Sequence, residues 1–166
     1  MAAPDGRIGR SVAGKYVLDS LIGTGNMGSV YQARHKSLDA CVAVKVMHEE
    51  LAKDPIFAER FYREARAASR LDHPNVIRVL DFGTEPDGLL YIVMDRVEGL
   101  DLGQIMSRDF LFSAERIVDL LSQTLSAVAA AHAVGIVHRD LKPENVMVTT
   151  RLDDEGRSRE VVKVCD

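Results

Sequence analysis

The segment His138-Arg139-Asp140-Leu141-Lys142-Pro143-Glu144-Asn145 combines an acid, a lysine and an amide within eight residues. It follows the apolar pair Ile136-Val137 and precedes another apolar run, so the sequence predicts a loop between two short strands. In such a loop Asp140 can accept a hydroxyl proton, Lys142 can neutralise charge on a phosphate, and Asn145 can hold a metal ion. A lone Asp or Asn is usually just a solvated loop residue. The ordered set, however, indicates a site for phosphate transfer.

A second candidate site is the glycine-rich segment Gly23-Thr24-Gly25-Asn26-Met27-Gly28, which has strand-like residues on both sides. Glycine lets the backbone turn tightly and bring its N–H groups close to phosphate oxygens, although ordinary hairpins also carry glycines. A dinucleotide-binding fingerprint requires a helix at the third glycine, whereas Ser29-Val30-Tyr31 is β-prone. A P-loop requires Gly-Lys-Ser/Thr at its end, and this segment lacks it. Both of these alternatives are therefore excluded.

Lys45 and Glu64 are candidates for an ion pair. Lys45 interrupts the apolar run 42–46, for which an edge-strand lysine is the simplest alternative interpretation. Asp54-Pro55 predicts the start of a helix that runs to about Leu71. Counting steps of three and four residues puts Glu64 on the apolar face of this helix, toward the core. Because burying either ion alone costs on the order of several kcal/mol, the two are expected to be partners.

The glycine-rich hairpin, the strand lysine, the helix glutamate, the turn His73-Pro74-Asn75 and the polar loop resemble, in this order, the motifs of protein kinases. Within that family the chain is most similar to bacterial Ser/Thr kinases of the eukaryotic-like type, and Lys142 favours Ser/Thr over Tyr as acceptor. The resemblance implies an α+β, bilobal kinase-like fold, with an antiparallel sheet and one main helix in the N-lobe and an incomplete helical C-lobe. It divides the chain into a flexible lead-in (1–14), an ATP-binding N-lobe (15–94), a hinge (95–99) and a partial C-lobe (100–166).

The resemblance also implies a role for each candidate residue. The catalytic set would be Asp140, Lys142, Lys45 and Glu64, with Lys45 on the nucleotide phosphates and Glu64 orienting it. Magnesium would be held by Asn145 and Asp166. ATP would be bound by Ile22, Gly23, Thr24, Gly25, Asn26, Met27, Gly28, Val30, Ala43, Lys45, Met94, Asp95, Val97 and Met147.

The last residues, 161–166, resemble the strand that leads into the family's Asp-Phe-Gly motif, with the polar stretch 151–158 as a hairpin insertion before it. Ser113 is expected to cap a helix to about Val134, ended by Gly135. The apolar face of that helix is expected to comprise Ile117, Leu120, Leu121, Leu125 and Val128 and to remain partly exposed. We therefore expect a kinase fragment that is inactive alone and marginally stable or prone to aggregate.

Composition limits the remaining alternatives. The chain has 166 residues, of which 46% are hydrophobic and 28% charged, as in globular proteins. Its net charge of −4 gives no indication of nucleic acid or an acidic membrane as partner. Cys41 and Cys165 lie in apolar runs, and the sequence has neither a membrane-spanning stretch nor a secretory signal, so a reducing, cytoplasmic location is expected.

Two other functions stay open at this point. A nucleotide-binding or scaffold module without catalysis would contain the same glycine-rich hairpin and Lys45. A small-molecule phosphotransferase has a similar loop, although Lys142 and Pro143 make it the least favoured. For a protein kinase the expected partners are proteins that present Ser or Thr hydroxyls, and the oligomeric state is not indicated.

Overall fold

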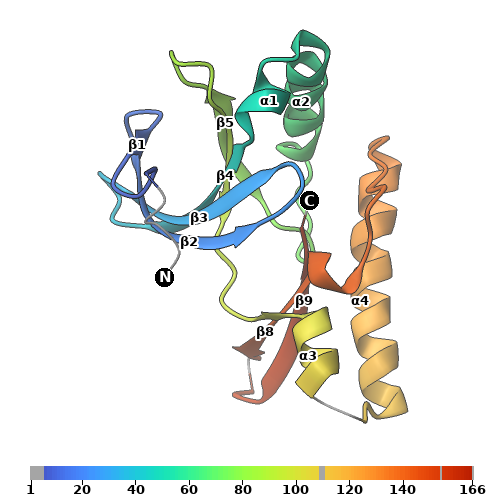
Figure 1. The fold of residues 1–166 in the computed structure, drawn as a ribbon. Helices are drawn as coiled ribbons and strands as arrows, with labels where there is room; N and C mark the ends of the chain where they lie inside the picture. The colour runs from blue at the N-terminus through green and yellow to red at the C-terminus, as the bar shows by residue number, and fades with distance from the viewer. Residues whose placement is uncertain (1–5, 109–110, 154, 166) are drawn as a thin grey trace. The chain divides into compact units, whose positions relative to one another are not determined.

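The computed structural model describes residues 6–108, 111–153 and 155–165. The chain forms two compact units, one made of Met1–Ser69 and Val79–Arg96 and the other of Arg70–Arg78 and Val97–Asp166. Each unit has its own sheet, its own helices and its own hydrophobic core (Figure 1). The expected α+β class is therefore confirmed.

The first unit is built on a six-stranded antiparallel sheet with the strand order β1-β2-β3-β4-β6-β5. Its elements, in chain order, are β1 (Ser11–Val12), β2 (Tyr16–Thr24), β3 (Gly28–His35), β4 (Cys41–Met47), α1 (Glu49–Ala52), α2 (Pro55–Ala68), β5 (Val79–Thr84) and β6 (Leu90–Asp95). One face of the sheet carries the main core, in which Val12, Leu18, Tyr31, Val44, Val46 and Val93 are completely buried. Helix α2 packs on the other face, where Phe61 joins a cluster with Met47 and Leu90. Because successive side chains of a strand point to opposite faces, the same strands contribute to both clusters.

Helix α2 begins as predicted, because the side chain of Asp54 accepts the N–H of Ile56 at 2.9 Å. The helix ends at Ala68, earlier than expected. Phe61 and Ala65 are its buried residues, whereas the side chain of Glu64 is 53% exposed and accepts a hydrogen bond from Arg60 Nε at 2.9 Å. The predicted burial of Glu64 is therefore wrong. Ala65, one residue further along the helix, occupies the buried position instead.

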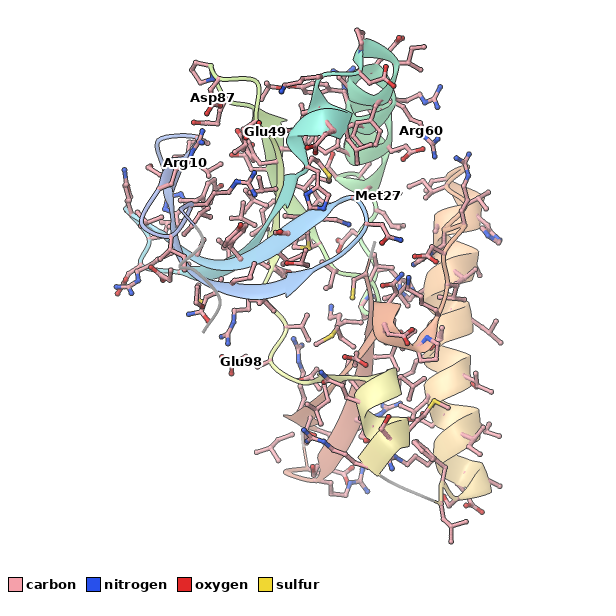
Figure 2. All side chains as sticks on the ribbon, viewed as in Figure 1. Arg10, Met27, Glu49, Arg60, Asp87 and Glu98 are labelled. Atoms are coloured by element: carbon pink, nitrogen blue, oxygen red, sulfur yellow. The ribbon has the colours of Figure 1, made fainter. Side chains whose placement is uncertain are left out.

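The N-terminal segment is more structured than predicted. Residues 6–14 form turns and strand β1, and Val12 is completely buried in the main core. Arg10 forms an ion pair of 2.7 Å with Asp87, which lies near it in Figure 2. The backbone N–H of Ala13 donates to the carboxylate of Glu85 at 2.8 Å. A flexible lead-in is therefore wrong for residues 6–14, and residues 1–5 lie outside the described part of the chain.

The second unit combines a three-stranded sheet of order β7-β8-β9 with a long helix. Its elements are β7 (Leu100–Asp101), α3 (Leu102–Arg108), α4 (Ala114–Ala133), the short 3-10 turn η1 (Pro143–Asn145), β8 (Val146–Leu152) and β9 (Ser158–Val164). Figure 1 shows α4 running beside β9. The core between them contains Ile105, Leu120, Ala127, Val146, Val148, Val162 and Val164. The predicted hairpin around 151–158 is confirmed, because β8 and β9 pair up to Leu152 and Ser158.

Helix α4 has the predicted ends. The hydroxyl of Ser113 accepts the N–H of Arg116 at 3.2 Å, and Gly135 follows the helix with a φ of +79°. Its buried residues are Leu120, Thr124, Ala127 and Ala131, whereas Ile117, Val118, Leu121 and Leu125 are exposed. Of the predicted apolar face, Ile117, Leu121 and Leu125 are thus exposed, whereas Leu120 is buried and Val128 is half-buried. Within the described ranges no helix is both long and apolar enough to cross a membrane.

Residues 70–78 belong to the second unit, although our boundaries assign them to the N-lobe. Val76 forms a parallel bridge with Val164, and the N–H of Ile77 donates to the carbonyl of Val164 at 2.9 Å. Strand β5 therefore begins only at Val79, because the residues before it are bonded to the end of β9.

The outer edge of β9 is covered by side chains. Gln123 of α4 accepts the N–H of Val162 at 2.9 Å through Oε1 and donates to the carbonyl of Glu160 at 3.1 Å through Nε2. Asn75 donates to Gln123 Oε1 at 2.9 Å and to the carbonyl of Val162 at 3.0 Å. These amide groups pair the backbone of β9 where a fourth strand would otherwise be needed.

Candidate active site

The polar loop brings its three predicted side chains together. Lys142 Nζ lies 2.8 Å from Asp140 Oδ2. Asn145 Nδ2 donates to the backbone carbonyl of Asp140 at 2.8 Å and to its Oδ2 at 3.2 Å. Turn η1 makes this possible, because Pro143 starts it and the N–H of Asn145 returns to the carbonyl of Lys142 at 2.9 Å. The predicted strand at 136–137 is wrong, however, since these residues form no strand and only β8 follows the loop.

The electrostatics of the loop keep Asp140 ionised. The hydrogen bond from Lys142 lowers the pKa of Asp140 from its ordinary value of 3.8, and the charges of Lys142 and His138 and the hydrogen bond from Asn145 act in the same direction. Desolvation opposes this shift but does not reverse it. Asp140 is exposed, so its carboxylate can reach an incoming hydroxyl group.

The loop is also tied to the end of β9. His138 Nε2 lies 2.9 Å from the carbonyl oxygen of Cys165, and the N–H of Cys165 donates to the carbonyl of Asn145 at 3.0 Å. Between these contacts Arg139 has a φ of +64°, a left-handed conformation that is uncommon for a residue with a side chain. Asp166, the second predicted magnesium ligand, follows Cys165 but lies outside the described residues.

The donor set of the loop suits a hard cation in part. The amide nitrogen of Asn145 is directed to Asp140, which leaves the amide oxygen as the atom that can face an ion. Carbonyl and carboxylate oxygens are the ligands that Mg²⁺ prefers. Within the ranges 6–108, 111–153 and 155–165, no three His, Cys, Asp or Glu residues form a metal-binding group. The amide oxygen of Asn145 is thus a suitable ligand for magnesium. The described residues do not add a cluster of His, Cys, Asp or Glu that would complete its coordination.

In the first unit, Lys45 and three of the apolar nucleotide-site candidates lie on one face of the sheet. Strand register pairs Val30 with Lys45 and Ala43 with Met94. Because residues two apart on a strand share a face, all four point to the same side. Lys45 is half-buried, and the same face carries Met47, on which the helix of Glu64 packs. Four of the side chains predicted to contact a nucleotide are therefore on one side of this unit.

The other predicted nucleotide contacts lie in different places. Ile22 is exposed near the end of β2, and Asp95 is the last residue of β6. Val97 and Met147 belong to the second unit, with Met147 half-buried in β8. The role of these four residues stays a prediction.

The glycine-rich segment is the predicted hairpin turn between β2 and β3. The N–H of Gly25 donates to the carbonyl of Gly28 at 2.9 Å, and the hydroxyls of Thr24 and Ser29 lie 3.3 Å apart. A Cβ atom on Gly28 would lie only 2.1 Å from the carbonyl oxygen of Val46, so this glycine permits a close approach to β4. Hydrogen bonds thus close the turn, and Gly28 cannot be replaced without movement of the backbone.

Two polar residues with informative contacts, His48 at the glycine-rich turn and Gln123 at β9, were not predicted. His48 Nε2 lies 2.9 Å from the carbonyl oxygen of Gly25, and Gln123 joins α4 to β9. No spacing rule indicates His48, because it lies between a strand and a helix and its partner is far away in sequence. The contacts of Gln123 were not predictable either, because in the sequence it is one of several polar residues of a helix and its partners in β9 are far away.

Comparison with known proteins identifies the family of this fold. The sequence model of the family described as "Protein kinase domain" matches residues 16–166. The Ser/Thr protein kinase pkn3 of Myxococcus xanthus is 49% identical over 162 residues, which are 98% of this chain and 29% of that protein. The Ser/Thr protein kinase PknH of Mycobacterium tuberculosis is 46% identical over 147 residues, which are 89% of this chain and 23% of that protein. The chain thus spans less than a third of either relative.

Solved structures agree with the sequence comparison. A double mutant of the PknI kinase domain of Mycobacterium tuberculosis superimposes with a TM-score of 0.82 at 32% identity, over 100% of this chain and 62% of that chain. Another crystal structure of the same domain gives a TM-score of 0.80 over 96% of this chain and 61% of that chain. The expected kinase-like fold is therefore confirmed. By its sequence and by its fold, this chain belongs to the protein kinase family.

Proposed function

We propose that this chain forms the ATP-binding and catalytic-loop part of a Ser/Thr protein kinase, which transfers the γ-phosphate of ATP to Ser and Thr hydroxyls of other proteins. The observation that carries the proposal is the contact between Asp140, Lys142 and Asn145 in the polar loop. It unites a proton acceptor, a cation and a metal-ligand oxygen, the groups that phosphoryl transfer needs. Relatives named as Ser/Thr protein kinases support the same assignment.

In this mechanism Asp140 orients the attacking hydroxyl and takes its proton. Its lowered pKa keeps the carboxylate ionised at neutral pH, so an acceptor site is always present. Lys142, already 2.8 Å from that carboxylate, adds a positive charge beside the oxygen that attacks. Its charge would offset the negative charge that the transferred phosphoryl group brings close to Asp140.

The first unit would bind the nucleotide. The hairpin of Gly23, Gly25 and Gly28 would cover the phosphates, and Lys45 would contact them from the face that it shares with Val30 and Ala43. Glu64 would orient Lys45 from helix α2. We also keep the division into an N-lobe (15–94), a hinge (95–99) and a partial C-lobe (100–166) as part of this proposal, except that residues 70–78 pack with the second unit.

Asn145 and Asp166 would hold Mg²⁺ through their side-chain oxygens. The ion, when bound, would supply neutralisation of phosphate charge. The protein's own contribution is to fix the Asn145 amide, whose nitrogen is bonded to Asp140 at the backbone oxygen and at Oδ2.

We further propose a cytoplasmic location, because Cys41 and Cys165 are not joined in a disulfide and kinases require ATP. The protein substrates themselves are part of the proposal only as a class, namely proteins with accessible Ser or Thr.

The test is a phosphotransfer assay with the whole kinase domain to which this chain contributes, Mg²⁺, labelled ATP and a generic basic protein. Transfer that the substitution Asp140→Asn abolishes would establish the proposed activity. ATP binding without transfer would favour a scaffold module instead. Label that moves to small-molecule acceptors and never to protein would favour a small-molecule phosphotransferase.

A further inference from the structure

The turn between β2 and β3 is bonded to one residue outside it, His48. The ring atom Nε2 of His48 lies 2.9 Å from the carbonyl oxygen of Gly25. The backbone N–H of the same residue donates to the carbonyl of Met27 at 3.0 Å. Met27 marks the tip of this turn in Figure 2. His48 thus contacts two carbonyl groups of the turn, one before Asn26 and one after it.

His48 can do this because of its place in the chain. It directly follows strand β4 and is the N-cap of α1, with an extended backbone (φ −64°, ψ 141°). An N-cap side chain commonly bonds to its own helix, but the ring of His48 forms no such bond. The ring is therefore directed to the glycine-rich turn. Because a carbonyl oxygen only accepts, Nε2 must carry the hydrogen.

The contact fixes the orientation of one peptide plane. In a planar trans peptide the carbonyl oxygen and the following N–H point in opposite directions, and no cis peptide occurs in the described ranges. With the carbonyl of Gly25 turned toward His48, the N–H of Asn26 points away from it. The bond from the N–H of Gly25 to the carbonyl of Gly28, 2.9 Å long, closes the turn and limits rotation of this plane.

We propose that His48 is a positioning residue that holds the N–H of Asn26 in the direction in which the turn receives the phosphates of a nucleotide. This inference rests on the proposed function, because it takes the nucleotide phosphates as the ligand of the turn. Without the ring, the Gly25–Asn26 peptide can rotate, since glycine has the widest choice of backbone conformations. Binding of phosphate would then also have to order the turn, which lowers the affinity.

The experiment measures the affinity of the 166-residue chain for ATP, ADP and adenosine, each with Mg²⁺. In His48→Ala we expect the affinity for ATP and ADP to fall by about tenfold, the effect of losing one hydrogen bond, and the affinity for adenosine to stay unchanged. In His48→Gln, whose side-chain amide can donate to the same carbonyl, most of the loss is recovered. The control His132→Ala removes an exposed histidine of α4 and should change none of the three affinities.

Equal loss for adenosine and ATP would show a general effect on folding and overturn the proposal, as would wild-type ATP affinity in His48→Ala. Amide hydrogen exchange without nucleotide gives a second measurement: His48→Ala should speed exchange at Gly25, whose N–H is bonded within the turn. If the wild-type chain binds no ATP, the proposed function fails. In that case unchanged exchange at Gly25 would also disprove a role of His48 in ordering the turn.

Discussion

The three glycines of the β2–β3 turn have unequal room for a side chain. At Gly23 an added Cβ atom would meet nothing within 4 Å, whereas at Gly28 it would lie 2.1 Å from the carbonyl oxygen of Val46. The two positions read alike in the sequence. Only the packing of the turn against β4 shows that Gly28 has no room for a side chain, whereas Gly23 does.

We expect Gly28→Ala to lower the free energy of unfolding by about 1 to 3 kcal/mol, because the methyl group forces the backbone of Gly28 away from Val46. Thermal or urea unfolding of the chain measures the change. Gly23→Ala is the matched control and should change the stability much less. Equal stability of the two variants would show that the turn does not pack on β4 as described.

The pKa of Asp140 provides a second prediction for a single residue. Lys142→Met removes the largest cause of the shift, so the pKa of Asp140 should rise toward its ordinary value of 3.8. A carboxyl group whose pKa is lowered by folding contributes stability above its unfolded pKa, and this contribution is lost as the pH falls through the folded pKa. In Lys142→Met that contribution is reduced. A ¹³C NMR titration of the carboxyl group measures both forms.

The control for this titration is Lys53→Met. Lys53 belongs to the first unit, where it pairs with Glu49 at 3.9 Å. An Asp140 that titrates at the same pH in the wild type and in Lys142→Met would contradict the hydrogen bond between Lys142 and Asp140.

Short-range chemistry at this scale was predictable from the sequence. Asp140, Lys142 and Asn145 lie within one loop and a turn that starts at a proline, so their side chains had to be close. The exposure of Glu64 was not predictable, because steps of three and four residues along a helix also reach the edge of its apolar face. There the small Ala65 packs inward and Glu64 bonds to Arg60.

At the scale of elements, the most informative contact is between α4 and β9. Gln123 and Asn75 take the place of a neighbouring strand along β9, which pairs with β8 on its other side. An exposed strand edge invites pairing with other chains. Here two amide side chains satisfy the edge, and the same strand leads to Cys165, which is bonded to the polar loop.

Replacement of Gln123 by Leu should lower the free energy of unfolding by about 1 to 3 kcal/mol, because the N–H of Val162 would be left without its partner. Urea unfolding measures the loss. Amide exchange at Val162 should become faster in the same variant. Gln104→Leu, a change at an exposed position of α3, is the control and should have little effect. Unaltered exchange at Val162 would refute the assigned role of Gln123.

Element positions were predicted best where local signals start or stop a helix. Ser113 and Gly135 bound α4 as expected, and Asp54 caps α2. The segment at 70–78 was misjudged, because its partner at the end of β9 lies in a distant part of the sequence. Long-range pairing of this kind has no local signature.

At the scale of the whole molecule, each unit has a separate hydrophobic core. The second unit also leaves an apolar surface on α4, where Val118, Leu121 and Leu125 are 63%, 52% and 62% exposed. Contiguous apolar surface of this kind favours association between protein molecules. The aggregation-prone chain expected from the sequence stays a prediction, and these exposed side chains of α4 support it.

We expect the 166-residue chain to self-associate at micromolar concentration, and the double substitution Leu121→Gln and Leu125→Gln to reduce this because it removes two exposed apolar side chains from α4. Sedimentation velocity measures the distribution of species. Leu38→Gln changes a leucine outside α4 that is 73% exposed and is the control. If the double variant of α4 associates to the same extent as the wild type and the control, the α4 surface is not responsible.

Strand β1 has a practical consequence for anyone who shortens this protein. The family match begins at residue 16, yet Val12 is sealed inside the first unit and Ala13 is tethered to Glu85. Trimming to the matched span would remove Val12 from the core and the hydrogen bond between Ala13 and Glu85. Truncated versions should therefore start upstream of Arg10, since the boundary recognised by homology falls inside the packed domain rather than at its rim.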